Sequence, residues 1–149
     1  MLARTHFAIG LAIALFFLPH VNNKLVFFPA VLIASILPEI GNILFRVRRK
    51  KSLKPFVPRN FLGGATRTYT FCITISVLLA FFYPILALPF FLGYSFNLFL
   101  NSFTPDGIMP FWPIGNKTTG KVTPGGTIDY TIFIVFIILD AIFLLRFAI

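Results

Sequence analysis

The sequence predicts an all-α, multi-pass membrane protein: a helical bundle of about four core helices followed by a C-terminal hydrophobic helix. Two observations predict this class. The chain of 149 residues is 58% hydrophobic and only 11% charged, whereas soluble domains carry roughly 25% charged residues. Its apolar residues form long runs bounded by basic clusters and prolines, which is typical of membrane-spanning helices. We therefore expect one integral membrane domain over residues 1–149.

The first two hydrophobic segments are expected at Leu2–Leu18 and Leu25–Phe45. Arg4 precedes the first apolar run as it would in a signal peptide, but no small-residue cleavage site follows, so we interpret the segment as a retained helix. It is short beside the ~20 residues of a full span. Pro29 and Pro38 are expected to interrupt the second segment, because proline removes a backbone donor.

Three more segments follow at Thr66–Tyr83, Ile85–Phe103 and Thr127–Ile149. Each is rich in apolar residues, and proline separates the third from the fourth. A Gly-, Pro- and Thr-rich stretch over residues 104–126 precedes the last segment and is predicted to be a loop. The C-terminal helix is expected over residues 127–149.

The basic residues predict the orientation. Eight of the thirteen Lys and Arg residues lie between Arg46 and Arg67. Such clusters mark the cytoplasmic side of a membrane protein, so the basic loop over residues 46–67 is predicted to be cytoplasmic. Its Arg46–Arg59 part also suits contact with anionic lipid or with another membrane subunit. The net charge of +9 follows from this cluster and is not interpreted as nucleic-acid binding.

This topology places the unusual polar residues of four segments at one depth, near the cytoplasmic face. They are His6, Glu39, Arg67, Asn97 and Asn101. The two asparagines are separated by about one helical turn and face the same way. Polar groups inside a bilayer tend to face a bundle interior or a water-filled cavity. The sequence therefore predicts a polar cleft that opens towards the cytoplasm.

Each polar residue also has a structural interpretation. Asparagine amides commonly bridge membrane helices, and Glu39 is expected to form a salt bridge with Arg67 or with a residue of the basic loop. His6 is either a metal ligand, a helix-start histidine near lipid headgroups or a partner for Glu39. Asp106 lies between Pro105 and Gly107 and is first a turn residue, with a minor binding role in the cleft as the alternative.

Two acidic residues belong to the last segment. Asp129 lies near its start, where a negative charge suits the N-terminus of a helix. Asp140 lies deeper, and it either pairs with Arg146 or faces the bundle, because a spacing of six residues does not make direct helical neighbours.

By residue type alone, the cleft does not predict a metalloenzyme. A catalytic zinc usually has three protein ligands, and only His6 and Glu39 qualify as metal ligands here. An asparagine oxygen is a neutral, weak ligand. Arg67 adds a positive charge that opposes cation binding.

The order of the polar motifs nevertheless resembles a family. The matching residues are Thr5-His6 with Gly10, then Leu37 to Gly41, then Gly63 to Thr68, and finally Gly93, Tyr94, Asn97, Asn101, Ser102, Thr104, Gly107, Trp112 and Pro113. This pattern over residues 5–113 is similar to the YdjM-type proteins, a LexA-regulated group of small inner-membrane proteins regarded as metal-dependent hydrolases.

The chain keeps the glycine, proline and other structural residues of the family pattern better than it keeps the family's presumed metal ligands. It implies His6 and Glu39 as remaining metal ligands, with Glu39 as the candidate catalytic group. It also implies that Gly41, Arg67, Asn97 and Asn101 stand where the family has acidic residues or histidines. We therefore predict a non-catalytic relative with no cofactor, which binds membrane lipid or another membrane subunit.

Two other functions stay open at this stage. One is an active hydrolase that acts on a lipid or phosphoester at the membrane surface, with zinc or manganese as its cofactor and water activation as its chemistry. The other is a small transporter or channel component that uses the polar cleft as a path, although the chain has no internal repeat of the kind found in many transporters.

Overall fold

The computed structural model describes residues 2–51, 65–112 and 114–148, and these residues are helical apart from their turns and loops. The helices are α1 (Ala3–Phe17) with a 3₁₀ turn η1 (Leu18–His20), α2 (Lys24–Lys51), α4 (Tyr69–Phe82), α5 (Pro84–Ser102) and α6 (Thr127–Ala148). The all-α membrane class is confirmed. Among the described residues, three helical stretches are long and apolar enough to cross a membrane: Ala3–His20, Pro84–Ser102 and Thr127–Arg146.

The prediction for the second segment was wrong in two respects. Helix α2 continues through both Pro29 and Pro38, and it extends beyond Phe45 to Lys51. Proline is tolerated inside membrane helices because neighbouring helices and polar side chains satisfy the backbone groups that it frees. The extension follows from Arg and Lys, which are good helix formers once the apolar run ends. The rest of the basic loop, residues 52–64, lies outside the described residues, as does Pro113.

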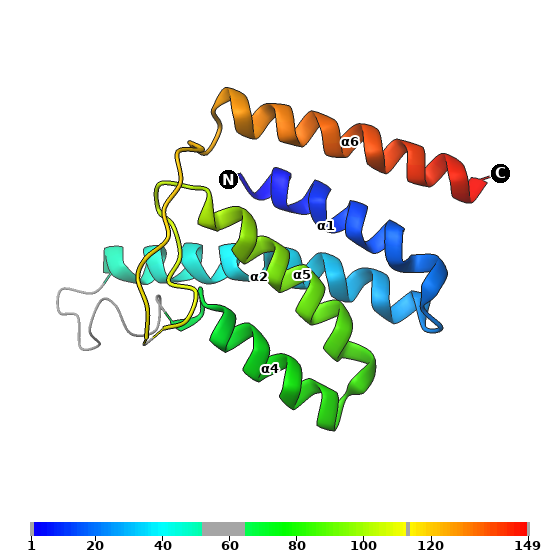
Figure 1. The fold of residues 1–149 in the computed structure, drawn as a ribbon, viewed down its shortest axis with the longest axis horizontal. Helices are drawn as coiled ribbons and strands as arrows, with labels where there is room; N and C mark the ends of the chain where they lie inside the picture. Colours follow the sequence, from blue (N-terminus) through cyan, green and yellow to red (C-terminus); the bar gives the residue numbers. More distant parts are fainter. Residues whose placement is uncertain (1, 52–64, 113, 149) are drawn as a thin grey trace.

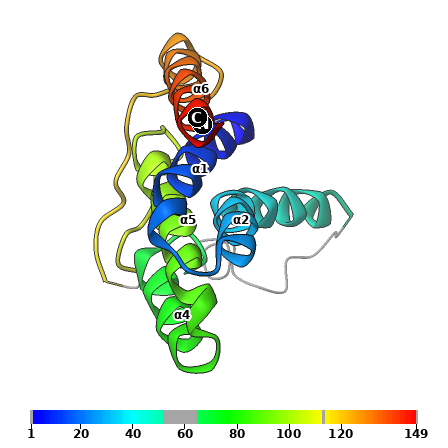
Figure 2. The same cartoon turned by 90° about the vertical axis from the view of Figure 1, so that its right-hand side faces the viewer.

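Successive helices alternate in direction. Helices α1, α4 and α6 run one way along the bundle, and α2 and α5 run the other way (Figure 1). The view turned by 90° shows α6 and α4 at opposite edges, with α1, α2 and α5 between them (Figure 2). The first and last helices are therefore parallel neighbours at one edge of the bundle.

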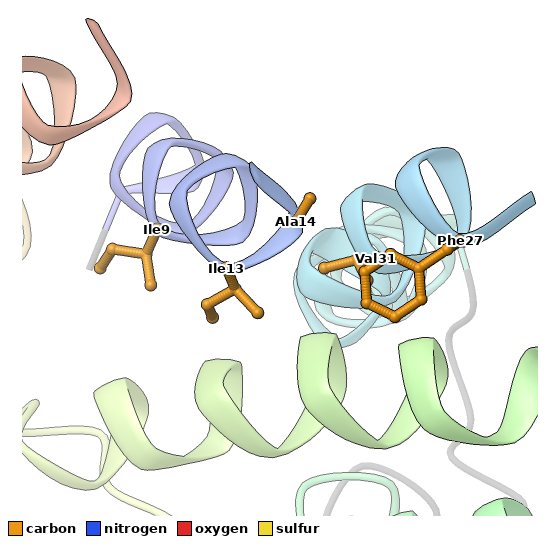
Figure 3. Close-up of a cluster of buried hydrophobic side chains, with 5 residues drawn as sticks. All are labelled: Ile9, Ile13, Ala14, Phe27 and Val31. Carbon is orange, nitrogen blue, oxygen red and sulfur yellow. The ribbon is translucent and has the colours of Figure 1, made fainter. Parts of the chain in front are cut away.

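The apolar core lies where α1, α2 and α5 meet. Its buried members are Ile9, Ile13 and Ala14 from α1 together with Phe27 and Val31 from α2. Ile9 and Ile13 point towards α5, beneath the contact between α1 and α2 (Figure 3). These buried side chains pack α1, α2 and α5 against one another along one line of contact, while apolar side chains also cover the outside of the bundle.

Glycine permits the close approach of α5 to α2. A Cβ atom at Gly93 would lie 2.9 Å from both the Cβ of Ala34 and the backbone nitrogen of Ser35. Such distances are well inside van der Waals contact, so no larger residue fits without a shift of the backbone. This approach lets short polar side chains on α5 reach groups on α2.

The loop after α5 folds back over the end of that helix. The amide of Val122 donates to the carbonyl of Phe103 at 2.9 Å, and the amide of Gly120 donates to the carbonyl of Thr104 at 3.0 Å. Gly107 has a positive φ of 57° and begins the turn that pairs Ile108 with Thr118. The loop thus closes the end of α5 that carries the polar residues.

Candidate functional site

Four polar side chains from three helices meet at one end of the bundle. They are His6 of α1, Glu39 of α2, and Asn97 and Asn101 of α5, and we refer to them as the polar centre. His6, Asn97 and Asn101 are at most 2% exposed, while the side chain of Glu39 is 20% exposed. The structure brings together these four of the five polar residues that the sequence singled out.

A line of hydrogen bonds joins α5 to α2. The amide nitrogen of Asn101 donates to Oδ1 of Asn97 at 2.7 Å and to Oε1 of Glu39 at 3.1 Å. The amide nitrogen of Asn97 donates in turn to the backbone carbonyl of Ser35. The helical-turn spacing of the two asparagines therefore lets one amide orient the other, and both amides bond directly to α2, Asn97 at Ser35 and Asn101 at Glu39.

His6 completes the polar centre from α1. Its Nε2 lies 3.6 Å from Oε1 of Glu39, which is an ion-pair distance but longer than a normal hydrogen bond. Neither ring nitrogen of His6 has a hydrogen-bond partner among the described residues. The imidazole is therefore held in place by packing, since it lies 1% exposed in α1.

Small residues explain how α1 approaches α2 at this level. Gly10 lies one helical turn after His6, and a Cβ atom there would lie 2.8 Å from the Cβ of Ser35. Ser35 itself is 3% exposed and donates its hydroxyl to the carbonyl of Leu32 at 2.8 Å. A glycine on α1 against a serine on α2 thus brings His6 close to Glu39.

Arg67 lies beside the polar centre but does not pair with Glu39. The only salt bridge within the described part of the chain that involves Glu39 is the one with His6, so the expected pairing with Arg67 is wrong. The guanidinium is close enough to act electrostatically on His6 and Tyr94. Its Nε is buried and has no hydrogen-bond partner among the residues that the structure describes.

The backbone around Arg67 explains its placement. Thr68 caps α4 by accepting from the amide of Phe71 at 3.1 Å, which leaves Arg67 in the turn before the helix. The hydroxyl of Tyr94 donates to the carbonyl of Thr66. The backbone of Arg67 is thereby held at the start of α4 by contacts of its two neighbours.

The other predicted acidic residues fall in different places. Asp106 is exposed in the turn after α5, as its Pro and Gly neighbours suggested, and within the described residues its side chain does not bond to the polar centre. Asp140 does not pair with Arg146, which is exposed on α6. It faces the bundle instead and is 3% exposed.

Asp129 joins the two ends of the chain. It is 1% exposed and accepts from the hydroxyl of Thr5 at 2.8 Å, from the amide of Leu2 at 3.1 Å and from the amide of Gly125 at 2.8 Å. The sequence indicated its helix-start position, which the structure bears out. It did not indicate that Thr5, the neighbour of His6, is its partner.

The residues of the polar centre do not fit a metal site. All His, Cys, Asp and Glu residues of the chain lie in the described segments, and no three of them there come together as a metal-binding group. The Oδ1 of Asn97 accepts from Asn101, and both amide nitrogens point at oxygen atoms of α2. Only His6 and Glu39 remain as donors, one fewer than a catalytic zinc requires.

Comparison with known proteins gives one match. The model of a family described as YdjM inner membrane protein matches residues 1–148 of the chain. No curated protein matches the chain, and no solved structure matches it either.

Proposed function

The chain belongs to the YdjM inner membrane protein family, and we propose that it acts in the membrane as a non-catalytic binding or scaffold subunit. One observation carries the proposal. The amide of Asn101 bonds both Asn97 and Glu39, so the polar residues of α5 and α2 bond one another. Hydrolysis assisted by a metal requires groups that are free to hold the metal and orient water. This arrangement supports a polar link between helices.

The charges suggest anionic lipid as the partner. Arg4, Lys117 and Lys121 are exposed and belong to segments at the end of the bundle where α2 finishes in its basic residues (Figure 1). Each Lys or Arg near an anionic membrane surface contributes about 1 kcal/mol of attraction. We propose that this end faces the cytoplasm and binds anionic headgroups.

A second candidate is the metal-dependent hydrolase that acts on a lipid or phosphoester. The observation in its favour is the pair of His6 and Glu39, 3.6 Å apart, with both imidazole nitrogens unbonded among the described residues and the carboxylate partly exposed. Asn97 and Asn101 weigh against this candidate, because an amide cannot serve as general base or as a charged ligand.

Native mass spectrometry of the purified protein distinguishes these functions, because one spectrum reports bound metal and bound lipid together. After incubation with zinc or manganese, we expect less than stoichiometric metal on the wild type and no change in His6→Ala. The double variant Asn97→His with Asn101→Asp restores the ligand types implied by the family resemblance, and we expect it to gain metal. That gain should disappear when His6→Ala is added.

The same spectra test the lipid partner in nanodiscs that contain equal amounts of phosphatidylglycerol and phosphatidylcholine. We expect preferential retention of phosphatidylglycerol, reduced in Lys117→Gln with Lys121→Gln and unchanged in the control Lys24→Gln at the other end of the bundle. Stoichiometric metal on the wild type that is lost in His6→Ala would overturn the non-catalytic proposal. Equal retention of both lipids would overturn the lipid partner.

A further inference from the structure

Asp140 is a buried carboxyl group that the polar centre does not use. It is 3% exposed, and neither of its oxygens has a hydrogen-bond partner among the described residues. It lies within the 20-residue apolar stretch Thr127–Arg146. Buried polar groups in proteins are nearly always bonded, so this carboxyl requires an explanation.

The side of α6 that faces α1 carries Asp140. Ile132 and Phe136 of α6 pack on the core cluster that contains Ile9 and Ile13, and Phe143 lies with its ring centroid 6.1 Å from that of Phe16. Residues four and three apart share one face of a helix, so Asp140 continues this stripe between Phe136 and Phe143. It therefore lies in the seam between α1 and α6, away from the lipid-facing side.

No charged group in the described chain neutralises Asp140. On α1, the guanidinium of Arg4 lies over the rings of Tyr130 and Phe133, about 10–15 Å before Asp140 along α6 at ~1.5 Å per residue. His6 faces Glu39. His20 of η1 contacts Phe16 and is exposed. On α6 itself, Asp129 bonds the start of α1, and Arg146 is exposed.

Contrast with Asp129 shows what state this environment favours. Asp129 accepts three hydrogen bonds from Leu2, Thr5 and Gly125, which suits a carboxylate ion. An ionised aspartate at the centre of a membrane helix is costly, and Asp140 has no bond among the described residues that offsets this cost. A proton bound to the carboxyl removes the charge.

We propose that Asp140 is a proton-binding carboxyl in the seam between α1 and α6, and that it is the site at which an apolar carbodiimide modifies this protein. The reaction needs the neutral acid. The carboxyl oxygen bonds to the central carbon of the carbodiimide while the acid proton moves to one of its nitrogens, which gives an O-acylisourea with no atom lost. Transfer of the acyl group to nitrogen then leaves a stable N-acylurea on the side chain.

The test uses dicyclohexylcarbodiimide on the full chain in lipid vesicles, followed by intact mass measurement and peptide mapping. We expect one adduct per chain, mapped to Asp140, whose yield falls as the pH rises because the ion does not react. Asp140→Asn should lose the adduct. The controls Asp129→Asn and Glu39→Gln should keep it. A water-soluble carbodiimide with glycine ethyl ester should modify exposed Asp106 and leave Asp140 unmodified.

Peptide mapping on the wild type keeps the test decisive even if a variant folds poorly. An adduct that maps to Glu39 or Asp129 would overturn the proposal, as would its persistence in Asp140→Asn. Absence of any adduct on folded wild-type protein, or equal modification of Asp140 by the water-soluble reagent, would also overturn it. None of these outcomes depends on the function of the polar centre.

Discussion

The seam between α2 and α5 and the seam between α1 and α6 are built in different ways. The first has a close backbone approach at Gly93 and a line of amide hydrogen bonds. The second seam includes α6, in which only 11% of the apolar stretch is buried, compared with 50% of the apolar stretch of α1. A hydrogen bond from Thr5 to Asp129 joins these two helices at one end. We infer that the closely packed pair α2 and α5 forms the frame of the polar centre, whereas α6 is joined to that frame through α1.

Gly93→Ala tests the first seam and should have the largest effect. A methyl group there would meet the backbone of α2, and backbone cannot move aside as a side chain can. Overpacking of this kind costs about 3 kcal/mol, at the upper end of its usual range. Unfolding of the protein in mixed micelles, followed by circular dichroism, should show the loss.

The control for this change is Gly115→Ala, in the loop, where a Cβ atom would lie 4.0 Å from Phe111 and would contact no other described residue beyond its chain neighbours. Gly115 has a φ of 129°, so alanine there strains the loop locally and should leave the packing of α2 and α5 unchanged. Equal destabilisation of α2 and α5 by both variants would contradict the close-packing explanation.

Asp129→Ala tests the second seam and should have the next largest effect. It leaves the hydroxyl of Thr5 and the amides of Leu2 and Gly125 without their acceptor. Removal of the acceptor from the buried hydroxyl of Thr5 accounts for most of the expected cost, about 2 kcal/mol. Hydrogen exchange should rise at the starts of α1 and α6 while α2 and α5 stay protected.

Asp129→Asn is the matched variant, because it retains one carbonyl oxygen and should recover part of the protection. Loss of protection across all helices at once would contradict the view that α6 is attached separately from the frame.

Asn101→Leu should have the smallest effect of the three. It keeps the branched outline of the side chain with a somewhat larger apolar group, and it removes the amide that donates to Oε1 of Glu39 and Oδ1 of Asn97. Hydrogen bonds between membrane helices contribute about 1 kcal/mol each, so a small loss of stability is expected in the same micelle assay.

Phe99→Leu, on an exposed position of the same helix, is the control and should be close to neutral. If Asn101→Leu were equally neutral, the amide line would have no part in holding α2 to α5, and the scaffold proposal would lose its main support.

The helix positions could be predicted from hydrophobic runs because each run is a local pattern. The first, third, fourth and fifth segments lie within a few residues of the observed α1, α4, α5 and α6. Helix α2 was predicted too short, since proline and basic residues weaken the local signal while packing and helix propensity preserve the helix. Packing against neighbouring helices decides whether a helix continues through a proline, and that packing has no local signature in the sequence.

The contacts of the polar centre could be predicted only where they are local in the sequence. Asn97 and Asn101 share one helix, so their contact follows from spacing alone. The partner of Glu39 depends on how α1, α2 and α4 rotate against one another, and there the sequence favoured Arg67 over His6. The acceptor for Asn97 is the backbone carbonyl of Ser35, and a backbone oxygen carries no residue type by which it could be recognised.

The bond between Thr5 and Asp129 has a consequence for biosynthesis. Its partners are 124 residues apart in the chain, and ribosomes add about 5–20 residues each second. The first helix must therefore wait several seconds in the membrane before its parallel neighbour exists. During that interval the side of α1 that will receive α6 is available to lipid or to an insertion chaperone, and assembly of the bundle can finish only after its last helix has been made.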